Sequence, residues 1–415
     1  MQLRLSYRYT LSTATAALFL SGCGGAGAPP AGPAASQQET AIHANAGTQA
    51  IQNVIVVIQE YRSFDNLFSG YPGADAPKKG LTSGGKYVRL RPIRLENDKL
   101  CMRDNQGGYF KIAYDHGKMD GWNLLDRRHP LCPYTHVINT ETQTYWDLAK
   151  RFALADKMFS TTRFGDFVDN IYLISGTTQI ARNAYDIGMA TSVPWSCAAQ
   201  PGTKTSLLKN GQILKNEGPF PCFDQFPSMA NLLDKANVPW RFYYGGKPQD
   251  DFPFNPYSAM QYVATGPDWK TDMSVPATNV LSDLANGNLK PVSWVLSAEP
   301  NSDFPGNSGG PQWVSAIVQA AQKSAYWKHV AIVVIWNDSG DGNFYDSVAP
   351  PQLDPMGLGF RVPMIVVSPY AKRGYVSHTQ YEFGSILKFI EENWNLGSLG
   401  STDQRANSIG DVFDL

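Results

Sequence analysis

Short runs dominated by apolar residues, many of them β-branched, recur along the chain, and the first of them, at 54–58, is unbroken and gives way abruptly to polar residues. Such runs are typical of strands buried on both faces of a parallel sheet. They lie at residues 54–58, 292–297, 330–336 and 362–368. Apolar residues at helical spacing occur at 144–152, in a stretch ending near 324, and at about 384–394. Strands that alternate with helices predict an α/β fold with a mostly parallel central sheet.

Polar residues closely follow three of the predicted strands. Glu60 comes after the first strand, Asn337 and Asp338 after the third, and a loop begins at Ser368 after the last. Because the carboxyl ends of parallel strands share one edge of a sheet, we expect these groups to converge there. For Glu60, the alternative is a surface carboxylate that caps the next helix. Hard oxygen ligands together with histidines suit a divalent metal ion in phosphoryl chemistry.

Another candidate position lies within residues 159–176, where Gly165 and Asp166 lead into an apolar stretch. This pattern predicts a tight turn that opens a helix. The first amide groups of a helix and its dipole favour a negatively charged group, so a phosphate or a nucleophile would be stabilised at this point.

Length and charge narrow the possible functions. The 415 residues suffice for one large α/β domain or two smaller ones. Lys and Arg number 35 against 36 Asp and Glu, for a net charge of −1. This balance gives no support for a nucleic-acid-binding surface, so we expect no nucleic-acid partner.

The pattern of residues at the N-terminus predicts a targeting segment. Two arginines precede a short apolar run, too short to span a bilayer permanently, that ends in Leu-Ser-Gly-Cys at Cys23. This resembles a bacterial lipoprotein signal at 1–22, which implies a lipidated Cys23 that anchors the protein to a membrane of the cell envelope, facing the periplasm or the exterior. Residues 23–50 would form a flexible tether. The alternative is an ordinary secretory signal with an incidental cysteine.

Four cysteines remain beyond Cys23, and an even number in an exported chain suggests two disulfides. The spacing favours Cys101–Cys132 and Cys197–Cys222, although three pairings are formally possible. The second pair lies in a Pro- and aromatic-rich region at about 180–275, interpreted as an irregular cap inserted into a domain at 51–415, with a short core segment near 240–244.

Several ordered motifs resemble the bacterial phosphoesterase family that contains phospholipases C and the acid phosphatase A type. The segment from Glu60 to Asp65 corresponds to the family's Glu-Asn-Arg-Ser-Phe-Asp hallmark. Further motifs match at 301–313, 336–346, 357–363, 368–371 and 378–381. The resemblance implies an alkaline-phosphatase-like α/β/α sandwich.

The resemblance also implies a set of site residues. A divalent metal ion would be held by Glu60, Asn337, Asp338 and Asp166, the last standing where the family has its nucleophilic hydroxyl. His116, Asp303 and His378 match the family's pattern and, with Asp166, are the candidate catalytic residues. The chain departs from the pattern at several positions: Tyr61 replaces an Asn, Asn337 a carboxylate, Asp166 a hydroxyl and Phe304 a histidine. Asn170 stands where related sequences often carry another histidine. Loss of an imidazole that donates a proton commonly costs about 10²–10⁴-fold in rate.

Two functions therefore remain open. The first is an exported, lipid-anchored phosphoesterase that hydrolyses phospholipids or phosphomonoesters with a divalent metal in a rearranged site. The second is a catalytically inactive member of the family that acts as a binding or scaffold protein at the cell envelope, which the simultaneous change of several functional positions favours.

Overall fold

An eight-stranded sheet forms the centre of the chain in this computed structural model, which describes residues 50–97, 101, 108–188, 195–245 and 255–415. Every neighbouring pair of strands is parallel except those of β15, which runs antiparallel to β14 and β6. The predicted mostly parallel sheet is confirmed. Across the sheet the strands are β12 (Met273–Ser274), β11 (Trp240–Tyr243), β13 (Val292–Leu296), β1 (Asn53–Gln59), β14 (Val330–Trp336), β15 (Met364–Val367), β6 (Ala153–Ala155) and β16 (Tyr375–Ser377).

The apolar runs of the sequence occupy the middle of this sheet. All residues of β1 and β14 are buried, and β1 pairs in parallel with β13 on one side and β14 on the other. A strand in this position has no face toward water, which explains why its sequence does not alternate. Each fully buried Val or Ile contributes about 1.5–3 kcal/mol, so these two central strands contribute strongly to the core.

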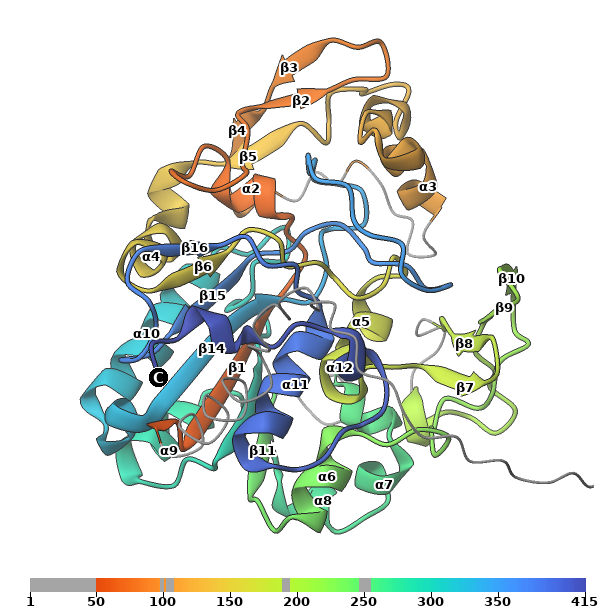
Figure 1. The fold of residues 1–415 in the computed structure, drawn as a ribbon. Helices are drawn as coiled ribbons and strands as arrows, with labels where there is room; N and C mark the ends of the chain where they lie inside the picture. The colour runs from red at the N-terminus through yellow and green to blue at the C-terminus, as the bar shows by residue number, and fades with distance from the viewer. Residues whose placement is uncertain (1–49, 98–100, 102–107, 189–194, 246–254) are drawn as a thin grey trace, which may run out of the picture. The chain divides into compact units, whose positions relative to one another are not determined.

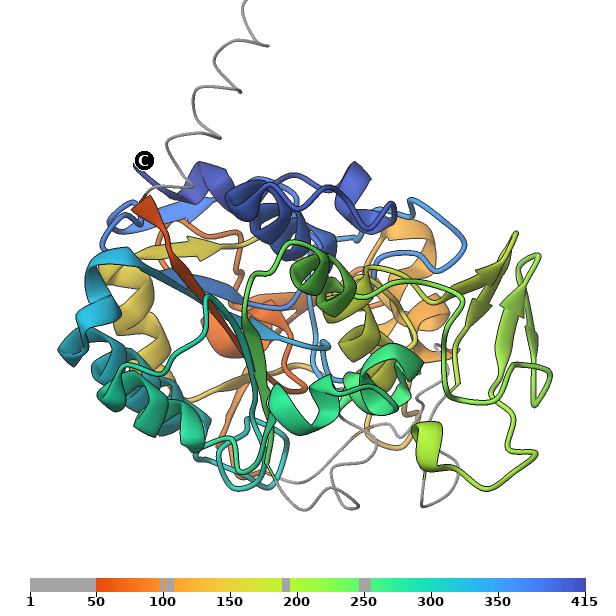
Figure 2. The ribbon, with the colours of Figure 1, turned by 90° about the horizontal axis from the view of Figure 1, so that it is seen from below.

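Helices cover both faces of the sheet. One layer contains α4 (Asn139–Arg151), α9 (Asn279–Asn286) and α10 (Gly310–Lys323), and the other α5 (Asp166–Ser175), α6 (Met229–Lys235), α11 (Phe383–Trp394) and α12 (Thr402–Arg405). Figures 1 and 2 show the strands running between α4 and α10 on one side and α5 and α11 on the other. The predicted helices at 144–152, before 324 and at 384–394 are present, and the α/β/α sandwich is confirmed.

The expectation that the loop after Ser368 joins the other polar groups is wrong. It assumed that the strand at 362–368 runs parallel to its neighbours, whereas β15 is antiparallel to both. Its carboxyl end therefore lies at the opposite edge of the sheet. An apolar run indicates burial but carries no information on strand direction, so the sequence pattern could not reveal the reversal.

The region predicted as an insertion at about 180–275 consists of two different parts. Its first part forms a separate antiparallel sheet of β7 (Gln179–Ala181), β8 (Ala184–Asp186), β9 (Leu207–Lys209) and β10 (Gln212–Leu214). Its second part contains α6, α7 (Gln261–Ala264) and α8 (Asp268–Thr271) and supplies β11 and β12 to the central sheet. The predicted core segment near 240–244 corresponds to β11.

Smaller elements lie at the end of the sheet toward which β1 points, at the top of Figure 1. They are α2 (Phe64–Phe68), β2 (Lys79–Leu81), β3 (Tyr87–Arg89), β4 (Arg91–Ile93), α3 (Gly108–Tyr114) and β5 (Thr135–Val137). The disulfide Cys101–Cys132 lies in this region and Cys197–Cys222 in the first part of the insertion, so both predicted pairings are confirmed.

Among the described residues, no helix is both long and apolar enough to cross a membrane. The predicted signal segment at 1–22, the lipidated Cys23 and the tether up to residue 49 lie outside the described residues.

Candidate functional site

The ends of β1 and β14 bring Glu60 beside Asn337 and Asp338. The two strands are paired up to Gln59 and Trp336, and the amide of Asn337 donates to the carbonyl of Gln59 at 2.9 Å. One step further, the amide of Arg62 donates to the carbonyl of Asp338 at 3.1 Å. Glu60, Asn337 and Asp338 are all buried, with 6%, 0% and 2% of their surface exposed. The structure thus joins at one sheet edge the three residues that the sequence predicted there.

The N-terminus of α5 faces the same edge. Asn170, in the first turns of this helix, accepts a hydrogen bond from the side chain of Asn337 at 3.3 Å. Gly165 precedes the helix with a φ of 79°, and a Cβ at this position would lie 2.7 Å from Oδ1 of Asp341. The turn thus requires glycine both for its backbone angle and for the close approach. The predicted tight turn that opens a helix is confirmed, and α5 begins at Asp166.

The side chain of Asp166 lies outside the part of the structure that is described. Its backbone opens α5 beside the loop that follows β14, which is where the sequence predicts its carboxylate. Its roles as metal ligand and as candidate catalytic residue stay predictions.

Asp341 and Tyr109 belong to this site but were missed in the sequence. Asp341 lies in the loop after β14 with a φ of 46°, an unusual conformation for a residue other than glycine. The ring of Tyr109 packs over Gly342, because a Cβ there would lie 2.8 Å from it. Burial and the negative charges of Asp341 and Asp338 raise the pKa of Tyr109 well above its usual value. The Gly-Asp-Gly sequence at 340–342 was the available signal for Asp341, whereas nothing near Tyr109 in sequence marks it.

The donor atoms at this edge are of the type that hard divalent cations prefer. Carboxylates of Glu60 and Asp338 and the amide of Asn337 offer oxygen ligands. Oδ1 of Asn337 is buried and has no hydrogen-bond partner among the described residues, so a cation would satisfy an otherwise costly group. Within the same described part, no three His, Cys, Asp or Glu side chains are grouped so that they could hold a metal ion. The residues therefore fit a metal in donor type, and the sequence predicts Asp166 as the source of a further carboxylate.

Two of the departures from the family motif pack against each other. The rings of Tyr61 and Phe304 have centroids 4.9 Å apart, and Phe344 meets Tyr61 edge-on at 6.4 Å. The hydroxyl of Tyr61 accepts a hydrogen bond from Asn343 at 3.1 Å. Tyr61 has a φ of 66°, which a tyrosine adopts less readily than the asparagine of the family motif. An aromatic cluster, Tyr61, Phe304 and Phe344, thus borders the position of Glu60.

Asp303, a predicted catalytic residue, directly precedes Phe304 of this cluster and is fully buried. Its Oδ2 accepts hydrogen bonds from the hydroxyl of Tyr145 at 2.8 Å and the indole of Trp336 at 2.9 Å. Its carbonyl accepts from the guanidinium of Arg62, which is buried as well. Burial raises the pKa of Asp303 to about 6, against the opposing charge of Arg62. These contacts connect Asp303 to Trp336 at the end of β14 and to Arg62 in the segment that follows Glu60. The catalytic role of Asp303 stays a prediction.

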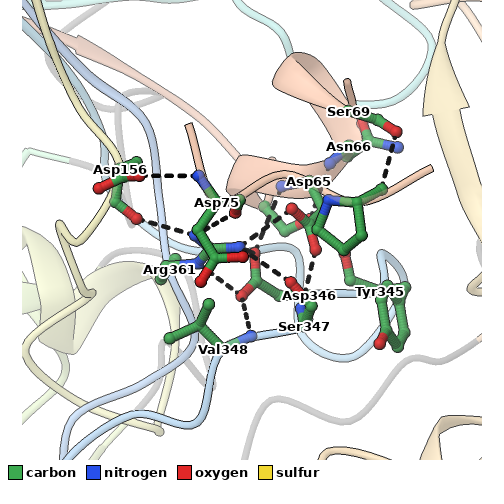
Figure 3. Close-up of polar contacts among 12 residues, drawn as sticks. Asp65, Asn66, Ser69, Asp75, Asp156, Tyr345, Asp346, Ser347, Val348 and Arg361 are labelled. Atoms are coloured by element: carbon green, nitrogen blue, oxygen red, sulfur yellow. Dashed lines mark hydrogen bonds and ion pairs between the residues drawn. The ribbon is translucent and has the colours of Figure 1, made fainter. Parts of the chain in front are cut away.

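A second buried charge cluster, which we call the Arg361 clamp, consists of Arg361, Asp65 and Asp346 (Figure 3). The guanidinium bonds Asp346 at 2.8 and 3.2 Å and Asp65 at 3.0 Å, and also donates to the carbonyls of Asp75 and Asp156. Burial and the charge of Asp346 raise the pKa of Asp65 well above its usual value. Because Asp65 follows Glu60 closely and Asp346 ends the loop after β14, the clamp fixes two of the segments that form the site.

His378 pairs with Asp156 at the carboxyl ends of β16 and β6. Its Nδ1 lies 2.9 Å from both carboxylate oxygens of the buried Asp156, while 57% of the His378 side chain is exposed. Four strand spacings of about 4.8 Å separate β16 from β1, so the axes of these two strands lie about 19 Å apart across the sheet. Among the described residues, no hydrogen bond or ion pair links His378 to Glu60 or Asp338, and its catalytic role stays a prediction.

His116 lies in a short 3-10 helix at Asp115–Gly117 and is exposed, with a φ of 56°. No hydrogen bond or ion pair between described residues connects it to Glu60 or Asp338. The predicted part of His116 in proton transfer stays a prediction as well.

Comparison with known proteins gives one family and a set of distant relatives. The Phosphoesterase family matches residues 51–397. The non-hemolytic phospholipase C of Pseudomonas aeruginosa is 23% identical over 87% of this chain and 56% of its own length. Phospholipase C B of Mycobacterium tuberculosis is 26% identical over 87% of this chain and 77% of its own length.

Against the phospholipases C of Pseudomonas aeruginosa and Burkholderia pseudomallei, the chain spans 56–60% of their length. Among solved structures, a Vibrio parahaemolyticus protein of the alkaline phosphatase superfamily is similar with a TM-score of 0.40 and 11% identity, covering 89% of this chain and 78% of that one. The sandwich described above and the family match agree with the alkaline-phosphatase-like fold that the sequence predicted.

Proposed function

Because the chain belongs to the Phosphoesterase family, we propose that it hydrolyses phosphate esters, either phospholipids or phosphomonoesters, at the edge where β1, β14 and α5 meet. Similarity to proteins named phospholipase C supports a phospholipid as the substrate. The observation that carries the proposal is the junction of the strand ends, where backbone hydrogen bonds hold Glu60 next to Asn337 and Asp338.

A divalent metal ion is the proposed cofactor. Glu60, Asp338 and the amide oxygen of Asn337 would hold it, with Asp166 as a further carboxylate. Such an ion polarises a phosphoryl oxygen and activates a bound hydroxyl or water. The remaining residues position these ligands: Asn170 orients the amide of Asn337, and the Arg361 clamp fixes both loops that carry the carboxylates.

A second candidate is a binding protein without catalysis. The observation that favours it is the contact between Tyr61 and Phe304, which fills with aromatic rings the positions where the family has an asparagine and a histidine. Such a protein would retain the fold and a phosphate ester or metal ligand at the cell envelope. Export and lipid anchoring through Cys23 are proposed for both candidates, and the support for them is the resemblance of the N-terminal sequence to a lipoprotein signal.

The test is hydrolysis of a chromogenic phosphate ester and of phosphatidylcholine, with each of several divalent metals added after chelation. We expect metal-dependent turnover that Glu60→Gln and Asp338→Asn each abolish. Metal affinity should fall by more than the roughly 10–100-fold typical of outer-sphere partners, because these residues are proposed as direct ligands.

The matched control is Glu299→Gln, which removes an exposed carboxylate outside the site. It should leave turnover unchanged. Metal binding by the parent without any turnover would favour the binding protein instead. Turnover that survives both Glu60→Gln and Asp338→Asn would contradict the proposed site.

A further inference from the structure

A strongly basic stretch lies between Asp75 and Glu96. It carries six Lys and Arg residues and no Asp or Glu, in a chain whose net charge is −1. All six are exposed: Lys78, Lys79, Lys86, Arg89, Arg91 and Arg94. The proposed phosphoesterase function leaves this concentration of positive charge unexplained.

The register of the β2–β3 hairpin shows which residues share its outer face. Gly80 pairs with Val88, and this inner face packs on Tyr134 and Tyr345, because a Cβ at Gly80 would lie 2.6–2.8 Å from their rings. The alternate pairs, Lys79 with Arg89 and Leu81 with Tyr87, therefore lie on the opposite face. The side exposed to solvent thus carries two cations and Tyr87, of which 68% is exposed.

The pairing of Lys79 with Arg89 across the hairpin destabilises the protein when nothing is bound to this face. Like charges directly opposite each other on neighbouring strands destabilise a hairpin. Lys79, Lys86 and Arg89 form no ion pair with another residue of the described ranges, whereas Arg94 is paired with Glu96 and Glu141. An anionic partner would remove the repulsion between Lys79 and Arg89, so the charge pattern points to a surface that binds negative charge.

Exposed apolar groups next to the cations indicate what kind of anion. The hairpin turn is hydrogen-bonded to Asn123 through Ser83, so the exposed Leu124 lies beside it. Arg91 donates to the carbonyl of Leu131, which is also exposed. Cations interleaved with tyrosine and leucine match the interface of a bilayer, where lipid phosphates and the outer acyl region lie at adjoining depths.

We propose that the β2–β3 hairpin, with Leu124 and Leu131, is a docking surface for a membrane that contains anionic lipids. The hairpin adjoins the site, because Leu81 donates from its amide to the hydroxyl of Tyr345 at 3.2 Å, and Tyr345 follows Phe344 of the aromatic cluster. Arg91 and Arg94 also line a cavity of about 530 Å³ together with Asn343 and Phe344. Figure 1 shows β2 and β3 at the end of the molecule where β1 ends.

The inference rests on the proposed function only in its last step, that the docked membrane carries the substrate. Binding is therefore measured without turnover, so the two proposals can fail separately. The full chain carries Cys23→Ala in every arm, which removes any contribution of a lipid anchor. Its partition onto phosphatidylcholine vesicles with and without phosphatidylglycerol is measured at about 0.1 M and about 1 M salt, where the Debye length falls from about 10 to about 3 Å.

We expect binding to vesicles with phosphatidylglycerol, weak binding to pure phosphatidylcholine, and loss of binding at high salt. Lys79→Glu should lower partition by at least about tenfold, since it changes the surface by two charges. The same substitution places opposite charges across the hairpin and should not destabilise it, so a loss of binding cannot be ascribed to unfolding. Tyr87→Ser should lower partition by about threefold to tenfold.

The matched controls lie on another hairpin, β9–β10, where Lys209 and Ile213 are also exposed. Lys209→Glu and Ile213→Ser should bind vesicles like the parent. Equal losses in these controls, or full binding by Lys79→Glu, would overturn the docking surface. Tighter binding to nucleic acid or to a sulfated polysaccharide than to the anionic vesicles would also overturn it in favour of a soluble polyanion.

Discussion

Two groups of buried polar residues lie at the same end of the sheet and differ in how far the protein itself satisfies them. In the Arg361 clamp, the guanidinium uses all of its nitrogens on carboxylates and carbonyls, and the carboxylates of Asp65 and Asp346 also accept from backbone amides. At the ends of β1 and β14, the side-chain Nδ2 of Asn337 donates to Oδ1 of Asn170. The side-chain Oδ1 of Asn337, in contrast, has no hydrogen-bond donor among the described residues.

This difference separates a structural cluster from a candidate binding position. A buried charge that has its own counter-charge and hydrogen bonds stabilises one conformation and leaves nothing for a ligand. A buried oxygen without a donor costs free energy unless something from outside completes it. The clamp therefore fixes the loops, whereas the strand ends are where a cation would gain binding energy.

The largest expected effect is on the clamp. Arg361→Met leaves Asp65 and Asp346 buried without their counter-charge, so the free energy of unfolding should fall by about 3–5 kcal/mol. Chemical denaturation with a fluorescence readout measures it. The matched control is Arg94→Met, an exposed arginine with two ion pairs, which should cost about 1 kcal/mol or less. Similar losses in both variants would show that the clamp is no more than a surface pair.

The environment of Asp303 is intermediate between that of the Arg361 clamp and that of the ends of β1 and β14. Its carboxylate accepts hydrogen bonds from two neutral donors, and the buried Arg62 lies nearby. Its pKa of about 6 lies above the ordinary value of 3.8, so the folded state holds the proton more tightly than the unfolded state. The stability it contributes is therefore present below about pH 4 and is lost as the pH rises to about 6, by up to about 3 kcal/mol.

Asp303→Asn keeps an acceptor for Tyr145 and Trp336 but cannot ionise. The free energy of unfolding should fall less in this variant than in the parent when the pH rises from 4 to 7, and the difference between the two should be up to about 3 kcal/mol. Denaturation of both proteins at pH 4 and at pH 7 measures it. Asp147→Asn, at an exposed carboxylate, serves as the control. Parallel pH profiles for the parent and Asp303→Asn would contradict the elevated pKa.

The sequence predicted these groups to different extents, for physical reasons. The ends of β1 and β14 were predictable because long apolar runs mark buried strands and parallel strands share an edge. The three-residue β6 and β16 are too short to give such a signal. Arg361 meets Asp65 across 296 positions of sequence and Asp303 meets Tyr145 across 158, so only the folded chain reveals these contacts.

Metal binding should distinguish the two groups by thermal unfolding. A metal ion bound only to the folded state, at about 100 times its Kd, stabilises it by about 2.7 kcal/mol. We expect this increase in the parent and in Asp65→Asn, since the clamp is not a ligand. Asn337→Ala should require much more metal for the same increase. An equal metal-dependent shift in Asn337→Ala and the parent would remove Asn337 from the site.

The smallest effect concerns the aromatic cluster that borders the strand ends. Tyr61→Asn removes a ring but relieves the positive φ of 66°, because asparagine adopts this conformation more readily. Phe304→His removes the partner ring at 4.9 Å and introduces an imidazole. A double-mutant cycle in unfolding free energy should give a coupling of about 0.5–1.5 kcal/mol, the usual worth of an aromatic pair.

The four proteins of this cycle are the parent, the two single variants and the double variant. Their turnover also distinguishes the two candidate functions, phosphate ester hydrolysis and binding without catalysis. The double variant restores the asparagine and the histidine of the family motif, so its metal-dependent phosphate ester hydrolysis should exceed that of the parent and of either single variant. A gain only in the double variant would show that the two rings block the site together. Unchanged turnover, combined with a coupling energy near zero, would mean that the rings neither support each other nor limit the chemistry.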